Sequence, residues 1–241
     1  MNLLLLTESD LDAEGLAELR DERIDHVRRI LRARPGDVLR VGRLDGPIGE
    51  GRIETLDRER LVLSVTWGGP PPPPLPATLI LALPRPKFLG RILQSATEVG
   101  VKEIVLLGTR RVEKSYWSSS LLEPAAIERH LRLGLEQACD TILPRVELER
   151  RFRRFVEQRL PELLAKGELI VAHVEAPRDF PADDATVAGV LVGPEGGLLD
   201  HEIEALAERG ARLVGLGPRT LRVETAVSVA LGALLRRQPV V

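Results

Sequence analysis

A run of prolines divides this chain and limits what it can fold into. Five consecutive prolines at 70–74 follow Gly68 and Gly69, and Pro76 comes soon after. Proline lacks the N–H that a sheet needs, so this stretch is extended and cannot lie inside a sheet. It suits either a spacer or a ligand for a proline-reading domain, and the different patterns on its two sides favour a spacer. We therefore expect a domain at 1–69, a linker at 70–76 and a second domain at 77–241.

The segment before the linker has the pattern of a small β-barrel with one helix. Short apolar runs rich in β-branched residues lie at 3–6, 38–41, 49–55 and 60–67, separated by turn residues. Residues 21–33 carry apolar side chains at helical spacing and stop at a Pro-Gly-Asp turn. Arginines crowd this part. They form either a solvated helix face or an edge that contacts an RNA backbone.

After the linker, predicted strands and helices alternate. Alternation of this kind predicts an α/β fold with a mainly parallel sheet covered on both faces. The expected strands are 77–83, 103–107, 168–172, 187–192 and 211–216. The expected helices are 88–99, 123–138, 150–165 (interrupted or kinked at Pro161), 200–209 and 224–237.

Two loops in this second part are candidate ligand sites. The stretches 191–198 and 216–226 each follow an apolar run and precede a predicted helix, and both contain glycine and proline. A strand, a Gly-rich turn and a helix place backbone N–H groups at the carboxyl edge of a parallel sheet, where ligands bind. Two ordinary βα turns would have the same composition. Spacing alone leaves both interpretations open.

Composition sets limits on partners and environment. The formal net charge is −2, so the chain has no global positive field for nucleic acid, although only four of its 34 basic residues are lysines. Arginine binds a phosphate through two hydrogen bonds and stacks on bases, so the distribution of the arginines matters more than the net charge of the chain. The single cysteine, Cys139, excludes an internal disulfide and is expected to be a buried core thiol. No run is long enough to span a membrane, and we expect a soluble cytoplasmic protein.

Several common catalytic motifs are missing. The chain has no dinucleotide fingerprint, P-loop or nucleophile elbow, and its four histidines and one cysteine show no metal-ligand spacing, so we expect no metal. Polar candidates remain near the two loops, namely Glu195, Arg219, Arg222 and Glu224. An arginine there can hold a phosphate or neutralise a developing anion. Glu224 can instead have a purely structural role, because a carboxylate at the start of a helix is stabilised by the helix dipole. It can also form an ion pair with Arg222.

The pattern of these loops, taken with the rest of the chain, resembles a known family. The matching segments are Gly193-Pro194-Glu195-Gly196-Gly197, Glu202-Ile203, Leu216-Gly217, Leu221-Arg222-x-Glu224-Thr225-Ala226, Gln94-x-x-x-Glu98-x-Gly100-Val101, Glu136-Gln137, Pro144 and His26-x-x-x-Ile30-Leu31-Arg32 before Pro35-Gly36-Asp37. Together they resemble the RsmE-type small-subunit ribosomal RNA uridine-N3 methyltransferases of the SPOUT superfamily. The chain departs from that pattern near Asp140 and Ile142, where the family usually has an arginine, and at Leu199, where a capping serine is common and Asp200 is our candidate cap.

The resemblance implies a PUA-like RNA-binding β-barrel followed by a SPOUT methyltransferase domain with a C-terminal trefoil knot. It implies a homodimer with the knot region at the interface, no membrane, and small-subunit ribosomal RNA, in the assembled particle, as the partner. The cofactor would be S-adenosylmethionine, held by knot loops that come close because of their glycines. The implied cofactor residues are His173, Leu191, Val192, Gly193, Gly196, Gly197, Leu216, Gly217, Leu221, Arg222 and Ala226.

The implied reaction is methyl transfer to N3 of a uridine in 16S ribosomal RNA. Arg222 would stabilise the charge that develops on the ring, and Glu224 or Glu195 would accept the N3 proton. The implied RNA-binding residues are Arg23, Arg29, Arg32, Arg110, Arg111 and Lys114. Two alternatives stay open: a methyltransferase acting on tRNA or large-subunit ribosomal RNA, and a non-catalytic RNA-binding or ribosome-assembly protein that retains the fold.

Overall fold

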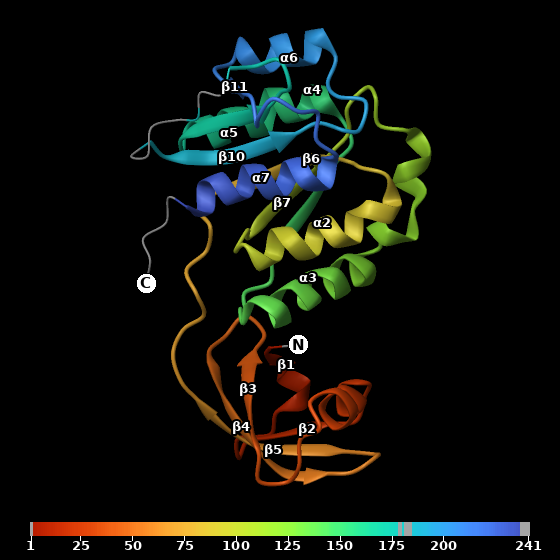
Figure 1. Cartoon of the computed structure of the whole chain (residues 1–241), viewed down its shortest axis with the longest axis vertical. Coiled ribbons are helices and arrows are strands. Elements are labelled where there is room, and N and C mark those ends of the chain that lie inside the picture. Colours follow the sequence, from red (N-terminus) through yellow and green to blue (C-terminus); the bar gives the residue numbers. More distant parts are fainter. Residues whose placement is uncertain (1, 178–179, 181–184, 237–241) are drawn as a thin grey trace. The chain divides into compact units, whose positions relative to one another are not determined.

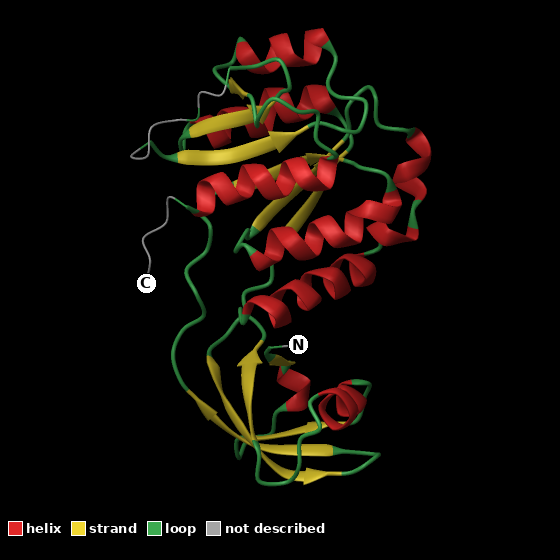
Figure 2. Ribbon diagram, in the orientation of Figure 1, coloured by secondary structure: helices red, strands yellow, loops and turns green. Residues whose placement is uncertain are grey.

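The computed structural model describes residues 2–177, 180 and 185–236. The chain forms two compact units, which Figures 1 and 2 show by sequence colour and by secondary structure. The first unit runs to Pro73 and also takes in Arg132–Leu143, and the second consists of Pro74–Leu131 and the chain from Pro144 onward. The sequence indicates a division at the proline run alone. The membership of Arg132–Leu143 in the first unit is therefore a feature that the sequence pattern did not indicate.

The first unit is built on a curled five-stranded sheet. Its strands are β1 (Leu4–Leu6), β2 (Leu16–Leu19), β3 (Val38–Arg43), β4 (Ile48–Leu56) and β5 (Leu61–Trp67). The spatial order is β1-β3-β4-β5-β2, with β1 parallel to β3 and the other pairs antiparallel. The expected small β-barrel is confirmed, although β2 was not predicted.

Strand β1 is buried on both of its faces. Leu4 and Leu6 lie in the core of the curled sheet, whereas Leu3 and Leu5 pack with Leu135 in a second apolar cluster of the same unit. Successive side chains of a strand point to opposite faces. Four consecutive leucines therefore suit a strand that has an apolar layer on each side.

The helix expected at 21–33 is shorter than predicted. The helical residues are α1 (Arg23–Asp25) and a π-helical turn, η2 (His26–Ile30). Arg32 then has a φ of 56°, in the left-handed region, which ends the helical path before Pro35. A short 3₁₀ turn, η1 (Glu8–Asp10), is the other helical element of the described part of this unit before β3.

The second unit contains a six-stranded sheet in which every pair is parallel. Its strands are β6 (Thr78–Ala82), β7 (Glu103–Leu107), β8 (Arg145–Glu149), β9 (Glu168–Ala172), β10 (Val187–Val192) and β11 (Arg212–Val214). Their order is β11-β9-β10-β6-β7-β8. The predicted parallel sheet is confirmed. Edge strand β8 was missed because its charged residues looked like part of an arginine-rich surface.

Helices cover both faces of this sheet. Helix α7 packs against α2 and β10, whereas α5 packs against β9 and β10 (Figure 1). All five residues of β6 are buried, as expected for a strand covered on both faces. The helices are α2 (Pro86–Glu98), the 3₁₀ turns η3 (Lys114–Ser118) and η4 (Ser120–Leu122), α3 (Pro124–Ala138), α4 (Phe152–Arg154), the π-helical η5 (Phe155–Arg159), α5 (Leu160–Leu164), α6 (Asp200–Ala207) and α7 (Val223–Leu235). In the part of the chain that the structure describes, no helix has the length and apolar character needed to cross a membrane.

Candidate functional site

A cleft of about 780 Å³ lies in the second unit at the carboxyl ends of four adjacent strands. Its walls are loops that follow β6, β9, β10 and β11, together with the start of α7. The two Gly-rich loops that the sequence marks as candidate ligand sites therefore line the same cleft. A third loop, beginning at His173, also lines the cleft.

The loop after β10 is a tight turn built from glycines. The N–H of Gly197 donates to the carbonyl of Pro194 at 2.8 Å, and Gly197 has a φ of 74°, which glycine adopts without strain. A Cβ on Gly196 would lie 3.2 Å from the side chain of Arg111. The guanidinium of Arg111 also donates to the carbonyl of Gly196 at 2.5 Å. The turn is thus shaped by its glycines and held by an arginine from the loop after β7.

The loop after β11 is joined to the loop after β9. The N–H of Gly215 donates to the carbonyl of Pro177 at 2.7 Å, and a Cβ on Gly215 would lie 2.3 Å from the carbonyl oxygen of Ala176. The N–H of His173 donates to the carbonyl of Val214 at 3.0 Å. Glycine at 215 therefore permits the close contact that fixes the third loop beside the second.

Nearly all of the predicted cofactor residues line this cleft. They are His173, Val192, Gly193, Gly196, Gly197, Leu216, Gly217, Leu221, Arg222 and Ala226. Leu191 is the exception: it is fully buried in the apolar core beneath the loops, together with Val171 and Leu198. The side chain of this β10 residue packs into the sheet's core and does not line the cleft, so a contact of Leu191 with the cofactor stays a prediction for its backbone alone.

The three predicted catalytic residues also line the cleft, but in different situations. One carboxylate oxygen of Glu195 accepts a hydrogen bond from the backbone N–H of Arg85 at 3.0 Å, which fixes the loop after β6 to the loop after β10. The side chains of Arg222 and Glu224 make no hydrogen bond or ion pair with any described residue, and in particular do not pair with each other. Both therefore remain available to a ligand. Within the described ranges, no group of three or more His, Cys, Asp or Glu residues is arranged to hold a metal ion.

Glu202 is the residue that caps helix α6. It is 2% exposed, and its Oε2 accepts from the N–H of Leu199 at 2.9 Å, while its Oε1 accepts from the N–H of Arg110 at 2.9 Å. The expectation that Asp200 takes the cap is wrong, because the carboxylate one turn into the helix reaches back instead.

Sequence reasoning missed part of the cleft wall. Arg85, Lys87 and Phe88 line it from the loop after β6 and the start of α2, and the Lys87 ammonium lies 4.8 Å from the centre of the Phe88 ring. These residues follow the predicted strand 77–83. Because the carboxyl ends of parallel strands face the ligand side of a sheet, the sequence could have identified them as residues of the cleft. Arg111 was predicted only as an RNA contact, yet it lines the cleft.

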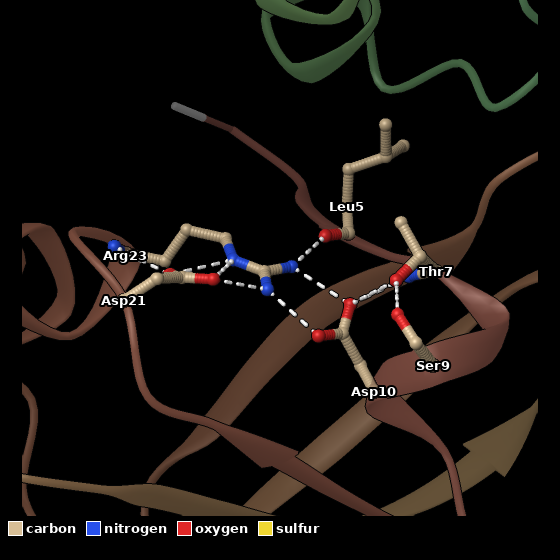
Figure 3. Close-up of polar contacts among 6 residues, drawn as sticks. All are labelled: Leu5, Thr7, Ser9, Asp10, Asp21 and Arg23. Atoms are coloured by element: carbon tan, nitrogen blue, oxygen red, sulfur yellow. Dashed lines mark hydrogen bonds and ion pairs between the residues drawn. The ribbon is translucent and has the colours of Figure 1, made fainter.

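Arg23, predicted to bind RNA, has a structural role in the first unit (Figure 3). Its guanidinium pairs with Asp10 at 2.8 Å and Asp21 at 2.5 Å and donates to the carbonyl of Leu5 at 2.8 Å, and its side chain is 19% exposed. Burial acts to raise the pKa of Asp10, but hydrogen bonds from Arg23 and Thr7 outweigh it and the pKa is lowered. The hydrogen bond from Arg23 likewise lowers the pKa of Asp21. These partners use the donors that an RNA phosphate would need.

The other predicted RNA-binding residues are exposed, namely Arg29, Arg32, Arg110, Arg111 and Lys114. Arg29 makes an i,i+4 ion pair with Asp25 at 3.4 Å, of the kind found on solvated helix surfaces.

Asp140, near the place where the resemblance leads one to expect arginine, is 3% exposed, and its Oδ1 accepts from the N–H groups of Thr141 and Ile142. It stabilises a turn in the first unit. Cys139 is half-buried rather than fully buried, because it lies at the edge of the cluster around Leu135.

Comparison with known proteins places the chain in a family. The family described as an RNA methyltransferase domain matches residues 71–235. The ribosomal RNA small subunit methyltransferase E of Treponema pallidum is 31% identical over 242 residues, which cover 98% of this chain and 91% of that protein. A crystal structure of a ribosomal RNA small subunit methyltransferase E from Neisseria gonorrhoeae bound to S-adenosyl methionine has the same fold, with a TM-score of 0.75 at 22% identity, covering 98% and 97% of the two chains. A Legionella pneumophila methyltransferase structure, in complex with the bound cofactor SAM, gives a TM-score of 0.74 at 23% identity over 98% and 97% of the chains. The chain therefore belongs to the ribosomal RNA small subunit methyltransferase E (RsmE) family of RNA methyltransferases.

Proposed function

We propose that this chain methylates N3 of a uridine in the 16S ribosomal RNA of the small subunit, with S-adenosylmethionine as methyl donor. Membership of the RsmE family supports RNA methylation, and the names of the relatives support the small-subunit substrate. One observation carries the proposal. The side chains of Arg222 and Glu224, which make no hydrogen bond or ion pair with a described residue, line the same cleft as the glycine loops.

The residues of the cleft suit S-adenosylmethionine. Its volume of about 780 Å³ lies within the range of small-molecule sites, roughly 300–1,000 Å³. Its rim carries both cations and carboxylates, and the cofactor has a carboxylate, an ammonium and a sulfonium. The glycines at 193, 196, 197 and 217 leave backbone groups open to close approach. We assign the apolar part of the cofactor to Leu216, Leu221 and Ala226, with His173 and Val192 completing the wall.

The chemistry assigns different tasks to the polar side chains. When bound, S-adenosylmethionine supplies a methyl group on a positively charged sulfur. N3 of uracil carries a proton at neutral pH, so its N–H bond must break as the N–CH₃ bond forms. Glu224 accepts that proton, with Glu195 as the second candidate because Arg85 already occupies one of its oxygens. Arg222 stabilises the negative charge that develops on the ring carbonyls.

The RNA must present an unpaired uridine, since pairing blocks N3. We propose that Arg29 and Arg32 of the first unit, and Arg110 and Lys114 of the second, contact its backbone. All four are exposed. Arg111 has a second task, since its guanidinium holds the carbonyl of Gly196 in the loop after β10. We further propose that the active form is a homodimer and that its substrate is the assembled small subunit.

The test uses ribosomal particles from a strain that lacks this chain. Small subunits, large subunits and tRNA are incubated separately with the purified protein and labelled S-adenosylmethionine, and the digested nucleosides are identified by mass spectrometry. We expect 3-methyluridine in 16S ribosomal RNA alone. Label in tRNA or large-subunit RNA would assign another substrate. Cofactor binding by calorimetry without methylation of any RNA would favour a non-catalytic assembly role.

A further inference from the structure

A second cavity, of about 730 Å³, lies in the second unit at the carboxyl ends of β7 and β8. Gly108 brings these ends together: its N–H donates to the carbonyl of Glu149 at 2.7 Å, and a Cβ there would lie 2.2 Å from the carbonyl oxygen of Arg150. As a result Thr109, which follows β7, and Arg150, which follows β8, line the same cavity. Helix α6 contributes the wall that contains His201.

Thr109, a residue of this wall, carries a hydroxyl that makes no hydrogen bond with a described residue. Thr109 is 8% exposed, and its Oγ1 is buried without a hydrogen-bond partner in the described part of the chain. Buried polar groups are almost always paired, so an orphaned hydroxyl on a residue of the cavity wall points to a ligand that supplies the missing bond.

The cavity has an excess of positive charge. Two carboxylates line it, and both are occupied: Glu157 pairs with Arg153 at 2.6 Å, and Glu202 accepts from two backbone N–H groups. Arg110, Lys114 and Arg150 make no ion pair with a described carboxylate. Unpaired arginine and lysine side chains around a cavity suit a phosphate-bearing ligand.

An aromatic ring stands beside one of these cations. The guanidinium carbon of Arg150 lies 5.2 Å from the centre of the half-buried Trp117 ring, and Phe152 lines the same cavity. Proteins hold single-stranded RNA by combining such rings, on which bases stack, with cations that contact the backbone. Phosphate alone would not need the aromatic wall.

We propose that this cavity binds one nucleotide of single-stranded RNA, with its base against Trp117, its phosphate at Arg150, Arg110 and Lys114, and a polar atom on the Thr109 hydroxyl. The inference rests on the proposed function insofar as this nucleotide belongs to the same RNA as the methylated uridine. The geometry supports that link. Arg110 lines this cavity and Arg111, the next residue, lines the cofactor cleft.

Fluorescence tests the base contact directly. The chain has two tryptophans, so in the full-length Trp67→Phe protein the emission comes from Trp117. Titration with pentauridylate should quench this emission in a saturable way, and inorganic polyphosphate at equal charge should not. Equal quenching by polyphosphate, or none by RNA, would overturn the assignment of a nucleotide.

Substitutions in the same background test the other two contacts by RNA anisotropy. Arg150→Gln should weaken binding at least fivefold, whereas Arg145→Gln, at the opposite end of β8, should leave it unchanged. Thr109→Val should weaken binding at least twofold without lowering Tm, because it removes an unpaired hydroxyl. Equal effects of the two arginine substitutions, or a lower Tm with unchanged binding for Thr109→Val, would overturn the site.

Methylation of small subunits separates this inference from the proposed function. Methylation by the wild type, together with an absence of Trp117 quenching, would reject the cavity and keep the function. Quenching together with the Arg150 effect, in a protein that methylates no ribosomal RNA, would keep the nucleotide site and reject the function.

Discussion

Glu202 accepts a hydrogen bond at 2.9 Å from the backbone N–H of Arg110, which lies 92 residues earlier in the chain. Its other carboxylate oxygen accepts from the N–H of Leu199, also at 2.9 Å, and the side chain is 2% exposed. One buried carboxylate thus joins the loop after β7 to the start of α6. The same two segments contribute to both cavities, because Arg111 and Asp200 line the cofactor cleft and their neighbours Arg110 and His201 line the second cavity.

Replacing Glu202 by alanine should lower the free energy of unfolding by about 2–4 kcal/mol, because two backbone donors lose a charged acceptor. Glu202→Gln should cost less, since its amide oxygen keeps one of the two bonds. Urea denaturation measures both. Glu204→Ala, at an exposed position of the same helix, is the control and should change stability by less than about 0.5 kcal/mol. A stability loss for Glu202→Ala no larger than that of the control would show that these bonds contribute little.

Arg222→Ala should reduce the methylation rate by about 10²–10³-fold while leaving the fold intact. The arginine is exposed and its side chain makes no hydrogen bond or ion pair with a described residue, so its loss removes charge stabilisation and little else. Rates are measured on small subunits at saturating cofactor. Arg236→Ala, at the other end of α7, is the matched control and should methylate normally. Comparable rates for both variants would remove Arg222 from the mechanism.

Glu224→Gln distinguishes proton acceptance from support of the helix start. Glutamine keeps the shape of the side chain but loses the carboxylate, so methylation should fall about 10²-fold or more if Glu224 takes the N3 proton. The loss of a favourable charge at the first turn of α7 should cost only about 0.3–1 kcal/mol. Single-turnover methylation and thermal unfolding are read on the same preparation. Full activity with a small loss of Tm would show that Glu224 only supports the start of the helix. Glu195 would then be the residue that accepts the N3 proton.

The Arg23 cluster should make the first unit's stability depend on acid pH. The folded-state pKa values of Asp10 and Asp21 lie below their ordinary values, so their contribution is present above the ordinary aspartate pKa and is lost as pH falls through the folded values. Arg23→Gln should therefore cost about 1–3 kcal/mol at pH 7 and progressively less below about pH 4. Urea unfolding across this range gives the comparison.

Arg60→Gln provides the reference for that series. Its ion pair with Asp57 spans 3.7 Å between side chains that are each about half exposed, so its effect on stability should be small at every pH. A pH-independent cost for Arg23→Gln would mean that packing of the arginine stem, rather than its pairing with the two aspartates, accounts for the loss.

The sequence predicts those features of this protein that local chemistry determines. The alternation after the proline run predicts the parallel sheet, because buried strands need continuous apolar runs wherever they lie in the chain. The glycines at 193, 196, 197 and 217 predict loops that come close to a ligand, because a residue without a side chain leaves the backbone open to close approach. Arg222 and Glu224 were found at the cleft because a loop at the carboxyl edge of a sheet faces the ligand side.

The missed features depend on tertiary contacts. Strand β2, Leu-Ala-Glu-Leu, has little β propensity and exists because it pairs with β5. Arg23 looks like its neighbours in the sequence, and only the fold shows that Asp10 and Asp21 use its donors. The position of the Leu191 side chain also depends on the fold. The strand register, which a single sequence does not show, decides whether this side chain lies in the core or in the cleft.

The inclusion of Arg132–Leu143 in the first unit has a consequence for synthesis on the ribosome. The five strands of that unit emerge early, but Leu135, which packs with Leu3 and Leu5, lies beyond Pro74–Leu131 in the chain. Until residue 143 has left the exit tunnel, one face of β1 keeps its leucines exposed to solvent and to chaperones. The nascent first unit therefore reaches its final structure only after residues 74–131 of the second unit have been translated.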